Sequence, residues 1–166
     1  MSAVRALGGI RAIAISHPHY YSCMVEWSHA FDAPVYLHEA DRQWVMRNDP
    51  GIEFWSGETR PLWDGMTLIR CGGHFEGGTV LHVAGSGALL AGDILQVAQD
   101  RDWVSFMYSY PNYIPLSEAK VDRIVAAVEP YEFDRIYGAW WDRNVRSGAK
   151  HAVRRSAERY KAAIRG

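Results

Sequence analysis

The sequence predicts a domain of the α/β or α+β class, in which strands and helices mix along the chain and the sheet is mixed. Short β-branched and aliphatic runs alternate with segments of helical periodicity. No linker, internal repeat or low-complexity tract divides the 166 residues, and this length allows one substantial core. Hydrophobic residues make up 48% of the chain and charged residues 22%, which excludes a disordered protein. We therefore expect a single domain over residues 1–166.

The first part of the chain predicts two strands, each followed by a helix. Residues 11–16 form a short apolar strand. Apolar side chains then recur at helical spacing over residues 22–31, and Asp32-Ala33-Pro34 ends that helix. A second strand over 35–37 precedes a helical stretch over 39–46.

Residues 48–65 are rich in Pro, Gly, Asn and Asp, so we expect loops there. The hydrophobic pattern beyond them predicts, in order, strands at 67–71, 79–84 and 88–91, a helix from Ser117 to Val128, a strand at 133–137 and a C-terminal helix. Gly85-Ser86-Gly87 is expected to join two of these strands as a tight hairpin, and Ser117 to cap its helix.

The charge of the chain indicates no general affinity for nucleic acid or acidic lipid, because the net charge is −1. The basic residues near the C-terminus have the spacing of the solvated face of an amphipathic helix: Lys150, Arg154, Arg155, Arg159, Lys161 and Arg165. Two cysteines are too few for a disulfide framework. No segment approaches the ~18–20 apolar residues of a membrane span. We expect a cytoplasmic protein with a small-molecule substrate and no nucleic-acid or membrane partner.

A pair of histidines follows the first predicted strand. In an extended chain, His17 and His19 lie on the same side, ~6–7 Å apart. Pro18 disfavours a helical conformation at His17, so we expect an extended pair that converges on one ion.

The predicted hairpin adds a third histidine and an aspartate. His74 lies in a glycine-rich loop before the strand at 79–84, and Asp93 follows the strand at 88–91. Because the two strands fold back on each other, the chain before the first and the chain after the second meet at the same end. Three imidazoles and one carboxylate suit a single divalent ion, with zinc as the first choice and iron or manganese as alternatives.

These stretches resemble the metallo-β-lactamase-fold metallo-hydrolases. Residues 13–19 are similar to the family's HxHxDH strand end, residues 68–79 to its glycine-flanked third histidine, and residues 88–93 to its Gly-Asp motif. The resemblance covers most of the chain. It implies an αβ/βα sandwich with mixed sheets and a metal site at one sheet edge, held by His17, His19, His74 and Asp93.

The sequence departs from the family pattern at three places. Tyr21 and Ser22 stand where the family has the aspartate and histidine that bind a second metal, and Gly138-Ala139-Trp140 lacks the family's last histidine. All three losses fall on the second metal position. The resemblance therefore implies a mononuclear centre, with Asp93 as fourth ligand or nearby carboxylate.

The chain is also shorter at its N-terminus than the family pattern, which usually opens with β-hairpins. An uncovered apolar sheet face or open edge promotes association. Either the start of the chain is truncated or another protomer covers the exposed sheet, and we expect a homodimer or larger assembly.

Several further residues are candidates for the site. Asp93, Glu76 and Tyr21 are the candidate catalytic residues, with Glu76 as a neighbour of the ligands or a replacement base, and Cys23 is a candidate substitute ligand. Tyr20 and Tyr21 offer a phenol to the site or fill the space of the absent second ion. The aromatic segment 103–111, with Trp140 and Trp141, is a candidate lining for an apolar pocket. The remaining histidines are expected to be structural (His38, His82) or solvent-facing (His29, His151).

Three functions fit this pattern. The first is a mononuclear metallo-hydrolase acting on a small-molecule ester, lactone, thioester or related substrate. The second uses His17, His74 and Asp93 as a two-histidine, one-carboxylate iron site, which resembles the persulfide dioxygenases of the same superfamily. The third is a catalytically degenerate binding or assembly protein that keeps the fold.

Overall fold

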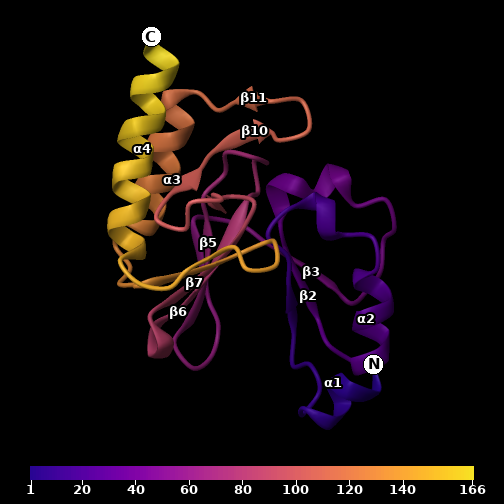
Figure 1. The fold of residues 1–166 in the computed structure, drawn as a ribbon. Coiled ribbons are helices and arrows are strands. Elements are labelled where there is room, and N and C mark those ends of the chain that lie inside the picture. The colour runs from indigo at the N-terminus through magenta and orange to yellow at the C-terminus, as the bar shows by residue number, and fades with distance from the viewer.

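The computed structural model describes residues 1–166 and places two sheets face to face between outer helices (Figure 1). Helix α2 (Met24–Phe31) lies outside the smaller sheet, and helices α3 (Glu118–Val128) and α4 (Ala149–Arg165) lie together outside the larger one. A short helix α1 (Ser2–Ala6) opens the chain. The predicted αβ/βα sandwich with mixed sheets is thus confirmed.

The smaller sheet is parallel and has the strand order β1-β2-β3: β1 (Ile13–Ala14), β2 (Val35–His38) and β3 (Ile52–Trp55). Its strands run parallel because a helical segment joins each consecutive pair. These segments are α2 and the 3₁₀ helix η2 (Glu39–Trp44), which is shorter than the helix expected over 39–46.

Residues 48–65 are mostly turns and loops, as expected, but they also hold two short strands that the sequence did not indicate. β3 pairs with β2 through four residue pairs, and β4 (Thr59–Pro61) pairs with the next strand. Each is only three or four residues long and lies between turn residues. Such short strands depend on a neighbouring strand for their hydrogen bonds, and their own sequence pattern is too short to indicate them.

The larger sheet has six strands in the order β13-β12-β7-β6-β5-β4. β12 runs parallel to β7, whereas the other neighbours are antiparallel. Its remaining strands are β5 (Met66–Arg70), β6 (Thr79–Val83), β7 (Ala88–Gly92), β12 (Arg135–Gly138) and β13 (Asn144–Val145). Two small ribbons complete the fold: β8 (Gln96–Val97) with β9 (Val104–Ser105), and β10 (Met107–Ser109) with β11 (Ile114–Pro115).

The hairpin between β6 and β7 forms as predicted. A 3₁₀ turn over Ala84–Ser86 leads to Gly87, whose φ of 58° lies in the left-handed region that glycine adopts without strain. Leu81 pairs with Leu90 across the hairpin. The loop before β6 and the loop after β7 therefore lie at the same end of the sheet.

The main core lies between the larger sheet and helices α3 and α4. It is a cluster of 21 buried residues, among them Leu89, Phe106, Ile124, Ile136 and Val153. Ser117 occupies the N-cap position of α3, although its side chain makes no capping hydrogen bond. No helix in the structure combines the length and the apolar character needed to cross a membrane.

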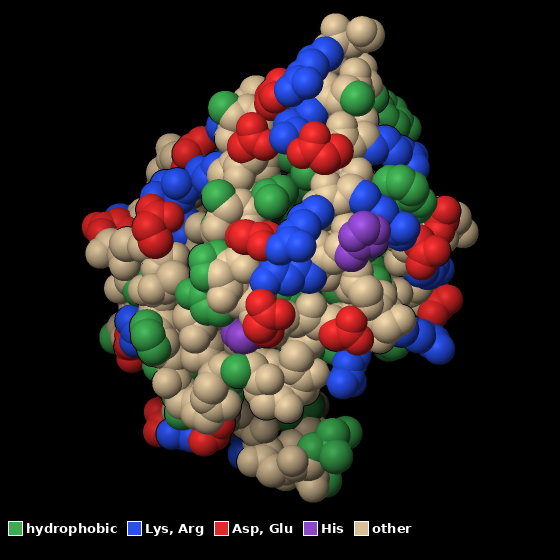
Figure 2. Space-filling model, turned by 90° about the vertical axis from the view of Figure 1, so that its left-hand side faces the viewer, with side chains coloured by type: hydrophobic (Ala, Val, Ile, Leu, Met, Phe, Trp, Pro, Cys, Tyr) green, Lys and Arg blue, Asp and Glu red, His purple; other side chains and the backbone are tan.

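The basic residues of α4 face acidic residues of α3 and the segment that follows it. Ion pairs join Lys150 to Glu132, Arg154 to Glu129, Lys161 to Asp122 and Arg165 to Glu118. Figure 2 accordingly shows basic and acidic side chains interspersed on this face. Four of the six basic residues of this face thus have acidic partners, whereas Arg155 and Arg159 lie over the ring of Trp103.

Candidate metal centre

His17 and His19 lie at the end of β1, on the edge between the two sheets. His17 has the extended backbone that the following proline favours, with φ −169° and ψ 166°. Pro18–Tyr20 then forms a 3₁₀ turn, so the expectation of an extended pair was wrong beyond His17. Proline suits the first position of such a turn because its φ is already helical. The two rings still converge, with centroids 4.9 Å apart.

Two glycines bring the other donors to this edge. Gly73 has φ 84°, and a Cβ atom there would lie 2.6 Å from Cδ1 of Ile124. Only glycine lets the loop before His74 pack this closely on α3. Gly92 has φ 53°, and a Cβ atom there would lie 2.4 Å from Oγ of Ser16, so Asp93 begins directly beside the end of β1.

His17, His19, His74 and Asp93 converge on one point. One ligand atom from each lies within 4.8 Å of the others. The three imidazole centroids are 4.9, 5.0 and 5.1 Å apart, and the rings are inclined to one another by 73° to 76°. Nε2 of His17 lies 3.5 Å from Oδ2 of Asp93. The close approach of the donor atoms themselves, rather than the ring angles, indicates a common centre.

Three atoms of this cluster are buried without a hydrogen-bond partner: Nε2 of His17, Nε2 of His74 and Oδ1 of Asp93. An unpartnered buried polar atom costs about 1–3 kcal/mol, so three in one place are costly unless a ligand satisfies them. A divalent cation would satisfy all three, and its preferred donors are the nitrogen and oxygen atoms present here. The residues therefore fit a metal ion.

The backbone fixes the tautomer of His74. Its Nδ1 lies 3.1 Å from the carbonyl oxygen of Met107 and 2.9 Å from that of Tyr108. Carbonyl oxygens only accept, so Nδ1 carries the proton and Nε2 presents its lone pair to the cluster. His17 is held similarly, with Nδ1 2.9 Å from Oγ of Ser16. Such outer contacts are typical of metal-binding histidines.

The protonation states also suit a cation. Burial and the neighbouring His17 lower the pKa values of His19 and His74, which favours the neutral imidazoles that bind metals. Burial by itself would raise the pKa of Asp93. The neighbouring imidazoles of His17, His74 and His19 outweigh burial, so the pKa of Asp93 is lowered and the carboxylate is ionised.

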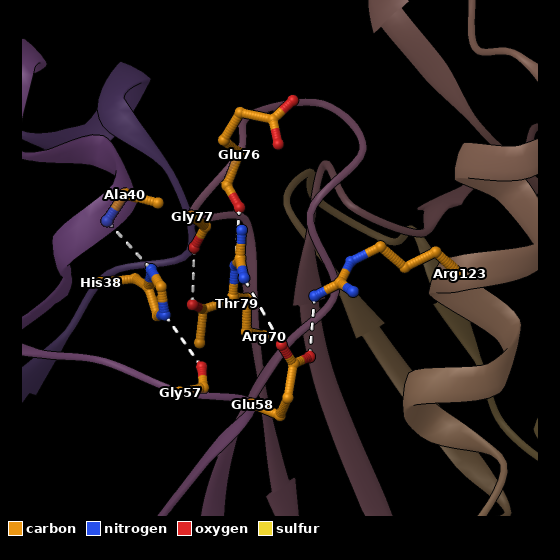
Figure 3. A network of polar contacts seen from close by, with 9 residues as sticks. All are labelled: His38, Ala40, Gly57, Glu58, Arg70, Glu76, Gly77, Thr79 and Arg123. Atoms are coloured by element: carbon orange, nitrogen blue, oxygen red, sulfur yellow. Dashed lines mark hydrogen bonds and ion pairs between the residues drawn. The ribbon is translucent and has the colours of Figure 1, made fainter.

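The loop that carries His74 is held by a polar network (Figure 3). Arg70 donates to the carbonyl oxygen of Glu76 at 2.9 Å, and Thr79 donates to that of Gly77 at 2.8 Å. Arg70 also pairs with Glu58, which accepts a second hydrogen bond from Arg123 of α3. The network ties this loop to both the larger sheet and α3.

Asp41 also supports this loop, and sequence reasoning missed it. The side chain is 1% exposed, and Oδ1 accepts a hydrogen bond of 2.8 Å from the Gly77 amide. Burial raises its pKa, and the Gly77 hydrogen bond opposes that shift only in part. Nothing in the local sequence indicates this role, because the contact spans 36 residues.

Two of the predicted catalytic residues lie away from the donor cluster. The carboxylate of Glu76 pairs with Lys120 at 2.7 Å. Tyr21 packs on the cluster of Met24, Val25, Val35 and Leu37. Tyr20 instead lies against the donors, with its ring 4.9 Å from that of His17, and burial together with the charge of Asp93 raises its pKa.

The remaining cysteines and histidines stand outside the cluster. Cys23 is exposed and does not belong to it, whereas Cys71 is buried, as expected. His38 and His82 are buried in strands and bond to the carbonyl oxygens of Gly57 and Glu132, which is the predicted structural role. His29 and His151 are exposed, and His29 pairs with Asp49.

The aromatic segment 103–111 serves several purposes. Tyr108 lines a groove next to His19 and His74, whereas Phe106 lies in the core and Trp103 contacts two arginines of α4. Trp140 and Trp141 are 58% and 98% exposed and do not line that groove. Their predicted place in a pocket was wrong, because the turn between β12 and β13 carries them into solvent.

Comparison with known proteins places this geometry in context. No family model matches the chain. An uncharacterized protein of Bacillus subtilis (strain 168), YmaE, is 55% identical over 161 residues, which are 95% of this chain and 58% of that protein. The chain thus spans somewhat more than half the length of this relative.

Solved structures of similar fold include a metallo-β-lactamase and a chemotaxis sensor. The DIM-1 metallo-β-lactamase is 15% identical with a TM-score of 0.71, over 98% of this chain and 74% of that one. The sensor ODP, in a peroxy diiron form, is 21% identical with a TM-score of 0.62, over 96% of this chain and 76% of that one. The sandwich, the donors gathered at its edge and these structural neighbours together show that the chain has the metallo-β-lactamase fold.

Proposed function

We propose that this chain is a metal-dependent hydrolase with a mononuclear centre, acting on a small-molecule ester, lactone, thioester or related substrate. The observation that supports it most strongly is the convergence of three buried, unpartnered atoms from His17, His74 and Asp93. With His19 they form a set of three imidazoles and one carboxylate. Three imidazoles are one ligand set of zinc sites that keep the fourth position open for substrate, with Asp93 as fourth ligand or nearby carboxylate.

The proposal of a single ion follows from the residues around the cluster. Tyr21, which stands where the resemblance expects a second-metal carboxylate, packs into apolar side chains instead. Of the other nearby carboxylates, Glu76 is paired with Lys120 and Asp41 accepts a hydrogen bond from the Gly77 amide. Zinc is the first choice, with iron or manganese as alternatives. Bound at this cluster, a divalent ion would supply Lewis-acid chemistry toward a carbonyl or ester group.

The chain's own groups would then hold protons and position the substrate. Asp93 is ionised, and its buried Oδ1 is free to accept a hydrogen bond or a proton. The raised pKa of Tyr20 keeps its phenol protonated, so it can donate a hydrogen bond to an oxygen beside His17. His74 keeps one tautomer through its two carbonyl partners and cannot rotate without losing both.

A second candidate function is metal binding without turnover. The ion pair between Glu76 and Lys120 favours it, because Asp93 is then the only carboxylate in the cluster that can act as a base. A chemotaxis sensor is among the proteins of similar fold.

The decisive test combines metal analysis with a panel of substrates. Purified protein is stripped with a chelator, reloaded with zinc, iron or manganese, and assayed on esters, lactones, thioesters and phosphoesters. His74→Ala removes a ligand, and His151→Ala on the exposed face of α4 is its matched control. We expect one ion per chain, and hydrolysis that His74→Ala abolishes and His151→Ala retains. One bound ion with no turnover on any substrate would favour the second candidate. Failure to bind any of the three metals would overturn both.

A further inference from the structure

A groove of about 760 Å³ opens beside the donor cluster and includes His19 and His74 in its lining. Besides Pro18, His19 and Lys120, its walls come from three parts of the fold. These are the segment from Asp41 to Met46, the loop around His74, and the ribbon of β10 and β11. In Figure 1 this ribbon projects from the α3 side toward the smaller sheet. A substrate in this groove would lie directly against two of the candidate ligands.

Large apolar side chains are exposed along both walls of this groove. Trp44 and Met46 on one wall are 49% and 93% exposed, and Tyr108 and Ile114 on the other are 53% and 45% exposed. Exposure of these apolar side chains to water is unfavourable, and an apolar ligand that buried them would gain binding free energy. A concentration of such residues beside a polar cluster is typical of a ligand site rather than of ordinary surface.

The groove offers an anion no unpaired cationic side chain. Lys120 is the only lysine or arginine in its lining, and its ammonium group lies 2.7 Å from the carboxylate of Glu76. Asp41 also lines the groove, but it is 1% exposed and its Oδ1 accepts a hydrogen bond from the Gly77 amide. A carboxylate or phosphate held in the groove away from the donor cluster would therefore meet no unpaired lysine or arginine.

We propose that the groove binds the apolar part of a neutral acyl compound, such as an uncharged ester or lactone with an alkyl or aryl group, between Trp44 and Tyr108. The proposal rests on the proposed hydrolase function and narrows its substrate class. It excludes substrates that carry a carboxylate or phosphate on the part lying in the groove.

Binding to the metal-free protein tests this independently of catalysis. Octanamide is a neutral probe that resembles an acyl substrate, and octanoate is its anionic counterpart. Titration calorimetry should show octanamide binding about tenfold more tightly than octanoate. Because no metal is present, the preference does not depend on metal binding.

Three variants locate the binding and test the charge argument. Trp44→Ala should weaken octanamide binding about tenfold, since a large apolar contact is lost, whereas Trp141→Ala should leave it unchanged. Glu76→Gln frees the Lys120 ammonium and should strengthen octanoate binding without affecting octanamide.

Equal affinity for the two probes, no octanamide binding, or equal losses in the two tryptophan variants would each overturn the substrate class. The proposed hydrolase would survive any of these results if metal-dependent turnover is observed. Conversely, octanamide could bind with the expected pattern while the protein takes up no metal. That result would support the groove as a binding site and overturn the proposed hydrolase function.

Discussion

Replacement of Asp41 by alanine should loosen the loop that carries His74. The variant removes the acceptor of the Gly77 amide, whose hydrogen bond measures 2.8 Å, at a side chain that is 1% exposed. A buried amide left without a partner costs about 1–3 kcal/mol, and we expect the free energy of unfolding to fall by that amount. Because Gly77 lies three residues from His74, metal affinity should also fall, by about 10–100-fold as for other outer contacts of metal ligands.

Asp41→Asn is the matched control, because it keeps an acceptor oxygen at nearly the same position and removes only the charge. Urea unfolding of the metal-free proteins measures stability, and competition with a chromophoric chelator measures metal affinity. If Asp41→Ala and Asp41→Asn behave alike in both assays, the Gly77 hydrogen bond does not support the loop and the reasoning is refuted.

The difference in stability between the wild-type protein and Asp41→Asn should depend on pH. Burial raises the pKa of Asp41 in the folded state above its ordinary value of 3.8. A carboxyl group with a raised folded-state pKa contributes stability below its unfolded pKa and loses it as pH rises through the folded value. The wild-type protein should therefore lose stability relative to Asp41→Asn as pH increases from about 4. A gap that stays constant with pH would contradict the raised pKa.

Three further predictions concern packing and metal binding. Gly73→Ala should lower the free energy of unfolding in urea by at least about 2 kcal/mol, because the φ of Gly73 is 84° and the new Cβ atom would lie 2.6 Å from Cδ1 of Ile124 in α3. Gly85→Ala is the control: its new Cβ atom would meet nothing within 4 Å, so the change should be nearly neutral. Leu89→Ala should cost about 2–5 kcal/mol because Leu89 is fully buried, and the same change at Leu90, which is 42% exposed on the other face of β7, should cost less than about 1 kcal/mol. Because the pKa of His74 is lowered, the imidazole stays neutral in mildly acidic solution, and metal should be released only below pH 6.5, the ordinary pKa of histidine. Dialysis against buffers of decreasing pH measures this release. Release already at neutral pH would contradict the prediction.

Local patterns in the sequence were enough to predict the strands around the hairpin and the loops that hold His74 and Asp93. The hydrophobic runs over 67–71, 79–84 and 88–91 are long enough to form strands, and the short Gly85-Ser86-Gly87 segment between the last two favours a tight hairpin turn. The antiparallel return then places the two loops at one end whatever surrounds them. The likeness to the metallo-β-lactamase fold was also readable from these motifs, and the structural neighbours confirm it.

Contacts between distant segments decided the rest. β3 and β4 form because β2 and β5 supply their hydrogen-bond partners, which their own few residues do not encode. The 3₁₀ turn after His17 directs Tyr20 to the donors and Tyr21 to the apolar cluster. Because these two residues are identical and adjacent, the sequence does not indicate which of them faces the donors.

Support for the site likewise depends on tertiary contacts. The Asp41 carboxylate meets Gly77 across 36 residues, and the tautomer of His74 is set by carbonyl groups more than thirty residues away. The sequence therefore determined which donors are present and at which end of the sheet they lie, since residue type and strand reversal are local properties. Their orientation and protonation, and the groove beside them, arise only when the two sheets pack, because burial and hydrogen-bond geometry do not exist before that packing.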